Sequence, residues 1–204
     1  HKYSFDQDGG AVYINFQSGS VSTEEQYEIR VINSKVNVTD DYTISGFHHL
    51  KGWVERQLYY IIQFDKPIVS IDTIKGNEHN KAPICVFHFN QKKGDVLQAK
   101  VALSTVSIEG AYGNMDSELA HWNFNQVKEG SSKRWEDILS RVEIEGSVEQ
   151  KRNFYTSMYH LFFQPNNIAD VNGKYRGAND SVFVSLSGEY YSTFSLWDTF
   201  RAAH

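Results

Sequence analysis

The chain has 204 residues, and its 20 Lys and Arg against 25 Asp and Glu give a net charge of −5 with neutral histidine. This mild acidic excess argues against a nucleic-acid partner, because binding to phosphates requires a basic face. No stretch approaches the roughly 18 apolar residues of a membrane-spanning helix, and one cysteine, Cys85, permits no internal disulfide bond. Cys85 stands in an apolar run, so we expect a buried, unreactive thiol.

Short runs rich in Val, Ile, Tyr, Phe and Thr fill the first half of the chain, with clusters of Gly, Asn, Asp and Lys between them. They include AVYINF, YEIRVIN, KVNVTDDYTI, RQLYYIIQF, PIVSIDTI, PICVFHF and VLQAKVALSTVSI. Such runs at near-regular spacing are typical of an all-β sandwich. We therefore expect an antiparallel β-sandwich domain over residues 1–115.

One of these runs has apolar side chains on both faces. The even-numbered residues from Leu58 to Phe64 would share one face, and Tyr59, Ile61 and Gln63 would share the other. A strand that is apolar on both faces is usually covered on both sides. We expect a central strand here.

Helical spacing replaces the strand pattern near residue 115. Apolar residues from Phe124 to Val142 recur at intervals of three, four and their multiples, which predicts a helix that a glycine and two serines weaken in its middle. We expect a helical linker over residues 116–146. Ser147 and Gln150 fit a capping box at the start of a second helix, which Pro165 ends.

The remaining residues predict a loop over 166–181, then two short strands around a glycine turn, then the opening of another helix at Trp197. Residues 147–204 thus hold one complete helix and the opening of another, which cannot bury a hydrophobic core alone. His1 also opens a segment with the composition of a strand. We therefore expect the chain to be part of a longer protein that continues past residue 204.

The histidine and acidic residues give little indication of a metal site. His48 and His49 would point to opposite faces of a strand, which argues against a zinc site. The segment DVNGKYRGAND resembles a calcium loop only loosely, because the closing glutamate is missing. We expect Asx turns at Asp170 and Asn172, with Tyr175 and its neighbour Arg176 facing a cleft. The adjacent pair Asp40–Asp41 predicts a solvated turn.

The segment SLWDTFR carries the strongest chemical signal. A tryptophan beside an aspartate can hold a sugar, because the indole stacks on the C–H face and the carboxylate accepts two hydroxyl hydrogen bonds. The alternative is a helix start, with Trp197 in a core and Asp198 as a cap that pairs with Arg201. The residues alone leave both interpretations open.

A family resemblance rests on four stretches, namely VALSTVSIEGAYGNM, FYTSMYHLFFQPNN, DVNGKYRGAND and YYSTFSLWDTFRAAH. In this order and spacing they resemble glycoside hydrolase family 92, the calcium-dependent bacterial exo-α-mannosidases. The resemblance implies a mainly β fold with α, in which a β sandwich is joined by helices to an (α/α)6 barrel. Residues 147–204 would be the incomplete beginning of that catalytic barrel.

The resemblance also implies roles for individual residues. Trp197 and Asp198 would line the subsite for the terminal mannose, with Arg201 as a partner of Asp198 or a substrate contact, and we extend a substrate contact to Tyr175. Family members are several times longer than this chain, and their general acid, general base and calcium ligands lie in the later part of the barrel. Inversion requires two carboxyl groups about 6.5–9.5 Å apart. We therefore expect no catalytic residue and no metal ligand in this chain, which would be inactive alone.

The expected function is removal of terminal α-linked mannose from glycans, with α-1,2 linkages as the expected target, by an inverting, calcium-dependent enzyme. The resemblance implies that such a bacterial enzyme is located in the periplasm, is secreted, or is held at the cell surface. One alternative is a non-catalytic carbohydrate-binding sandwich, and another is an interaction or scaffold domain. The sequence does not indicate an oligomeric state.

Overall fold

A computed structural model describes residues 1–17, 30–52, 55–78 and 81–193. Trp197, Asp198 and Arg201 lie outside the described residues. The chain divides into two compact units, of which the first comprises residues 1–122 and 169–188 and the second comprises residues 123–168 and 189–204. Among the described helices, none has the length and apolar character to cross a membrane.

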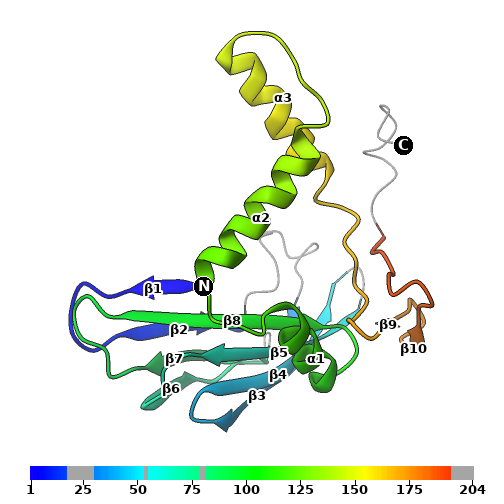
Figure 1. Cartoon of the computed structure of the whole chain (residues 1–204). Helices are drawn as coiled ribbons and strands as arrows, with labels where there is room; N and C mark the ends of the chain where they lie inside the picture. Colours follow the sequence, from blue (N-terminus) through cyan, green and yellow to red (C-terminus); the bar gives the residue numbers. More distant parts are fainter. Residues whose placement is uncertain (18–29, 53–54, 79–80, 194–204) are drawn as a thin grey trace. The chain divides into compact units, whose positions relative to one another are not determined.

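Two antiparallel sheets build the sandwich of the first unit (Figure 1), which also contains a two-stranded hairpin. The five-stranded sheet has the order β1 (Lys2–Ser4), β8 (Val96–Ser104), β5 (Arg56–Phe64), β4 (Thr43–Lys51) and β3 (Arg30–Asp40). The three-stranded sheet has the order β2 (Ala11–Asn15), β7 (Ile84–His88) and β6 (Ser70–Ile74). The predicted antiparallel sandwich is thus confirmed.

The core lies between the two sheets. Phe64 of β5 is 1% exposed, and its ring centroid lies 6.2 Å from that of the fully buried Phe87 of β7. Tyr60 and Ile62 belong to the same cluster, whereas Ile61 packs in a separate cluster on the other face. The predicted alternation of a central β5 is therefore confirmed. Cys85 is buried in the core as expected, and burial raises the pKa of its thiol.

A helix that the sequence did not predict, α1 (Ile108–Glu118), covers the outer face of the five-stranded sheet. The Ser107 hydroxyl caps it by accepting a hydrogen bond from Gly110 N at 3.0 Å. Ala111 and Met115 pack against Ile61 of the sheet. The helix has two glycines and a short apolar stripe, so its sequence signal is weak.

The second unit contains α2 (Phe124–Leu139) and α3 (Val148–Leu161). Both predicted helices are confirmed, and α2 runs without interruption through its central glycine and serines. The capping box of α3 is present, with Gln150 N donating to Ser147 Oγ at 3.2 Å and Ser147 N donating to Gln150 Oε1 at 2.8 Å. Trp135 and Tyr159 join the two helices at a ring-centroid distance of 4.3 Å. These helices form no closed barrel within the described residues.

The segment after α3 corrects the sequence prediction. A strand, β9 (Lys174–Arg176), lies inside the predicted loop and pairs with β10 (Val182–Val184). As far as the described residues extend, the two strands predicted around the glycine turn do not pair with each other, because β10 pairs with β9 and Tyr191 forms a bridge with Asn167. Asp180 has a positive φ of 63°, and its N–H donates to the Gly177 carbonyl at 3.0 Å. The Asn-Asp turn chemistry therefore closes a hairpin where composition alone suggested a loop.

Candidate functional site

Tyr175 is the one proposed substrate contact within the described residues. It lies on β9, opposite Phe183 of β10, and the two rings stack with centroids 5.8 Å apart at 30°. Tyr175 is partly exposed and Phe183 is exposed. The hairpin therefore presents an aromatic pair at the surface of the first unit, which suits contact with an apolar sugar face.

The sequence suggested that Arg176 faces a cleft. In the structure it does not, and its side chain instead fixes the hairpin. Its Nε donates to the Thr105 carbonyl at 2.7 Å, and its Nη2 donates to the Val106 carbonyl at 3.1 Å. Its Nη1 donates to the carbonyl and the carboxylate of Asp180 at 2.8 and 3.1 Å. The planar guanidinium thereby joins the hairpin turn to the segment between β8 and α1.

Asp170 is a second anchor of the hairpin, and it is only 2% exposed. Its carboxylate accepts hydrogen bonds from Ser104 Oγ at 2.8 Å and from Asn114 Nδ2 at 2.9 Å. Asn114 Oδ1 in turn accepts a hydrogen bond from Val171 N at 2.9 Å. A buried carboxylate is stable only with such donors, so this network fixes the hairpin against β8 and α1.

Of the two predicted Asx turns, the one at Asn172 is confirmed and the one at Asp170 is wrong. Asn172 Oδ1 accepts a hydrogen bond from Lys174 N at 3.0 Å, which is the expected turn. Asp170 was wrongly assigned, because its carboxylate is directed at the buried donors Ser104 and Asn114. Its partners lie 66 and 56 residues away in sequence, so local turn rules could not find them.

Close packing explains why residue 110, near the start of α1, is a glycine. A Cβ at this position would collide with the Asp170 carboxylate and the Ser104 hydroxyl. Gly110 lies two residues past the end of the predicted run VLQAKVALSTVSI, and it is the signal that sequence reasoning missed, because glycine often marks a close approach of the backbone to another group. Ser104, Asn114 and Gly110 thus complete the Asp170 anchor.

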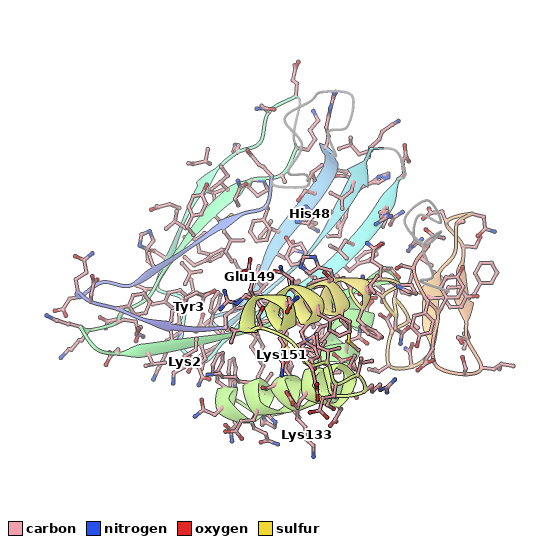
Figure 2. The ribbon with its side chains drawn as sticks, turned by 90° about the horizontal axis from the view of Figure 1, so that it is seen from above. Lys2, Tyr3, His48, Lys133, Glu149 and Lys151 are labelled. Carbon is pink, nitrogen blue, oxygen red and sulfur yellow. The ribbon has the colours of Figure 1, made fainter. Side chains whose placement is uncertain are left out.

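The adjacent histidines point to opposite faces, as predicted. His48, labelled in Figure 2, is 8% exposed, and its ring centroid lies 5.7 Å from Phe16 and 5.1 Å from Tyr60. Burial lowers the pKa of His48 to about 4. His49 instead lies 3.4 Å from Glu55 near the surface. Over the described ranges, no three His, Cys, Asp or Glu side chains gather as a metal site would require.

The sequence pattern of the glycosyl hydrolase family 92 N-terminal domain matches residues 1–104, and that of the family 92 catalytic domain matches residues 110–204. Comparison with curated protein sequences finds no match. Among solved structures, a family 92 α-mannosidase from Bacteroides thetaiotaomicron covers 99% of the chain at 26% identity, with a TM-score of 0.86. The structure of that protein in complex with mannoimidazole gives the same values.

A family 92 inverting mannosidase from the same organism covers 83% of the chain at 24% identity, with a TM-score of 0.72, and shares the fold. The chain spans 28% of the length of the first of these proteins and 25% of the last. The match over nearly the whole chain agrees with the fold class that the sequence predicted. On both domain patterns, the chain belongs to glycosyl hydrolase family 92.

Proposed function

We propose that the chain is the N-terminal part of an exo-α-mannosidase that removes terminal α-linked mannose from glycans. The observation that carries this proposal is the similarity over 99% of the chain to a family 92 α-mannosidase that was also solved with mannoimidazole. We further propose an inverting, calcium-dependent enzyme with α-1,2 linkages as its target. We propose that the enzyme is located in the bacterial periplasm, is secreted, or is held at the cell surface.

Substrate binding is the role that we propose for residues of this chain. The indole of Trp197 would stack on the apolar face of the terminal mannose, and the Asp198 carboxylate would accept hydrogen bonds from two neighbouring hydroxyls. Arg201 would orient that carboxylate or contact the sugar. Tyr175 is a further proposed contact, supported by its place on an exposed aromatic pair.

Calcium is a separate part of the proposal. A calcium ion takes six to eight oxygen ligands, several of them carboxylates. The part of the chain that the structure describes offers no matching group of side chains. The described residues therefore do not fit a calcium site, and we assign the calcium ligands to sequence outside this chain.

Bond cleavage is also assigned outside this chain. Inversion uses one carboxyl group as the general acid and another to activate water, with about 6.5–9.5 Å between them. Asp198 alone could not perform both steps. We therefore propose that the 204-residue chain holds the sugar but does not hydrolyse the bond.

The test is hydrolysis of α-1,2-mannobiose with calcium, by the intact protein that carries this chain and by the 204-residue chain. We expect the intact protein to release mannose with an inverted anomeric configuration, observed by NMR immediately after mixing. We expect no turnover by the shorter chain. Retention of configuration would contradict the mechanism, and turnover by the shorter chain would show that the catalytic pair lies within it.

A further inference from the structure

An open cleft of about 510 Å³ lies on the first unit, at the turn between β3 and β4. Asp40 and Tyr42 of this turn line it, together with Thr43, Gln63, Phe64 and Asp65 at the adjoining strand ends, and Trp122. All of these residues belong to one unit. The volume falls in the range of small-molecule sites, which is about 300–1,000 Å³.

The floor of this cleft includes Thr43 and Gln63, which belong to a polar row across three strands. Thr43 of β4 pairs in register with Gln63 of β5, and Gln63 pairs with Lys100 of β8. The row lies two residues along from Ile61 on β5, and therefore on the sheet face that α1 covers. Along β5, the polar Gln63 thus follows the apolar contact of Ile61 with α1.

Trp122 supplies an aromatic wall. Lys100 Nζ lies 4.3 Å from the centroid of the indole, within the range of a cation–π interaction. Burial lowers the pKa of Lys100, and the negative charge of Asp116 partly offsets this decrease. This contact restrains the indole and places the Lys100 ammonium over one face of the ring.

Two carboxylates at the cleft are also held in place. Asp40 Oδ1 accepts a hydrogen bond from Tyr42 N at 2.7 Å. Asp65 accepts hydrogen bonds from Gln98 N at 2.8 Å and from Gln98 Nε2 at 3.5 Å. Each ionised carboxylate offers about four lone-pair positions, so both retain capacity for further donors.

We propose that this cleft binds a neutral pyranose ring. An indole wall suits the C–H face of a sugar, and fixed carboxylates with the Gln63 amide suit its hydroxyls. Two carboxylates disfavour an anionic ligand, and a polar floor disfavours a purely apolar one. A metal is disfavoured because the described residues hold no group of three His, Cys, Asp or Glu side chains. This proposal does not rest on the mannosidase activity, since it uses none of the proposed substrate contacts.

The test is an NMR titration of the 15N-labelled 204-residue chain with methyl α-D-mannopyranoside and, separately, methyl β-D-glucopyranoside. The chain has four tryptophans, and Trp→Phe variants assign their indole N–H signals. We expect saturable shifts of the Trp122 indole and of the Gln63 and Asp65 amides, with a dissociation constant of about 1 mM or weaker. Absence of shifts with both sugars, or shifts at the Trp197 indole alone, would overturn the proposal.

Variants then separate this cleft from the rest of the chain. Trp122→Ala should weaken binding at least tenfold, as followed at the Gln63 and Asp65 amides. Gln63→Met keeps the length of the side chain and removes its amide, so it tests the site if Trp122→Ala does not fold. Trp135→Phe on α2 is the matched control and should leave the affinity unchanged. Equal affinity of Gln63→Met and the wild type would contradict a role for the floor.

Discussion

The two units differ in how they bury their side chains. The sandwich has a continuous core in which Phe64, Phe87 and Leu97 are almost fully buried. Within the described residues of α2 and α3, no side chain is buried, and Leu161 remains 63% exposed. Helices of 16 and 14 residues are marginal in water without tertiary packing. The sandwich therefore stabilises itself, whereas the helix pair depends on further apolar surface.

The largest expected effect sharpens this difference. Phe64→Ala should lower the free energy of unfolding by about 3–5 kcal/mol, because it removes a buried ring and leaves a cavity. Trp135→Ala, on α2, should cost much less because its surroundings are not buried. Urea unfolding of both variants, followed by circular dichroism, measures the two effects. Equal losses would contradict the division into a self-supporting and a dependent unit.

The next effect concerns the anchor of the hairpin. Asp170→Ala should cost about 3 kcal/mol, because it leaves the Ser104 hydroxyl buried without an acceptor and removes one of the two acceptors of Asn114 Nδ2, the other being the Leu103 carbonyl. Asn172→Ala is the matched control in the same loop and should cost less than about 1 kcal/mol, because its turn is exposed. A small effect of Asp170→Ala in chemical denaturation would mean that the hairpin is not fixed by this network.

A third prediction uses pH to probe the sandwich core. The folded pKa of His48 is about 4, below its ordinary value of 6.5, so unfolding takes up a proton between these values. Its contribution to stability is complete above pH 6.5 and is lost as the pH falls towards 4. The loss between pH 7 and pH 5 should be about 2 kcal/mol.

The control for this prediction is His48→Phe, which keeps a ring between Phe16 and Tyr60. Carboxylates titrate equally in both proteins, so the difference between their pH profiles isolates the histidine. We expect the profile of the variant to be flatter by about 2 kcal/mol between pH 7 and pH 5. Parallel profiles would show that His48 is accessible to protons in the folded state.

The smallest effect concerns the helix pair. Ser147→Ala removes the hydroxyl that accepts the Gln150 N–H and should cost about 1 kcal/mol in α3. Hydrogen exchange of the amides in the first turn of α3 measures this locally. Faster exchange there, with unchanged exchange in β5, is the expected result. Loss of protection across the sandwich would contradict the independence of the two units.

The sequence predicted the features that depend on local or periodic patterns. Alternation placed Tyr60 and Ile61 on opposite faces of a central β5, and the capping box located the start of α3. It missed α1, whose packing on the sheet outweighs a weak local preference. It also missed the anchoring roles of Asp170 and Arg176, because their partners are distant in sequence.

The same limit applies to the cleft that we propose as a sugar site. The pair Asp40–Asp41 predicted only a solvated turn, and nothing local connects Asp40 with Trp122. Strand register brings Thr43, Gln63 and Lys100 into one row, and Lys100 then meets the indole. Trp197, Asp198 and Arg201, which lie outside the described residues, stay predictions from the sequence.

The most direct test of the proposed function is the kcat/KM of Asp198→Ala, measured in the intact protein that carries this chain. With an aryl α-mannoside and calcium, we predict a loss of roughly a thousandfold, or about 4 kcal/mol of transition-state stabilisation. The thermal unfolding of the variant should match that of the wild type, so that the loss reports substrate binding. A kcat/KM equal to that of the wild type would contradict the role of Asp198 in the mannose subsite.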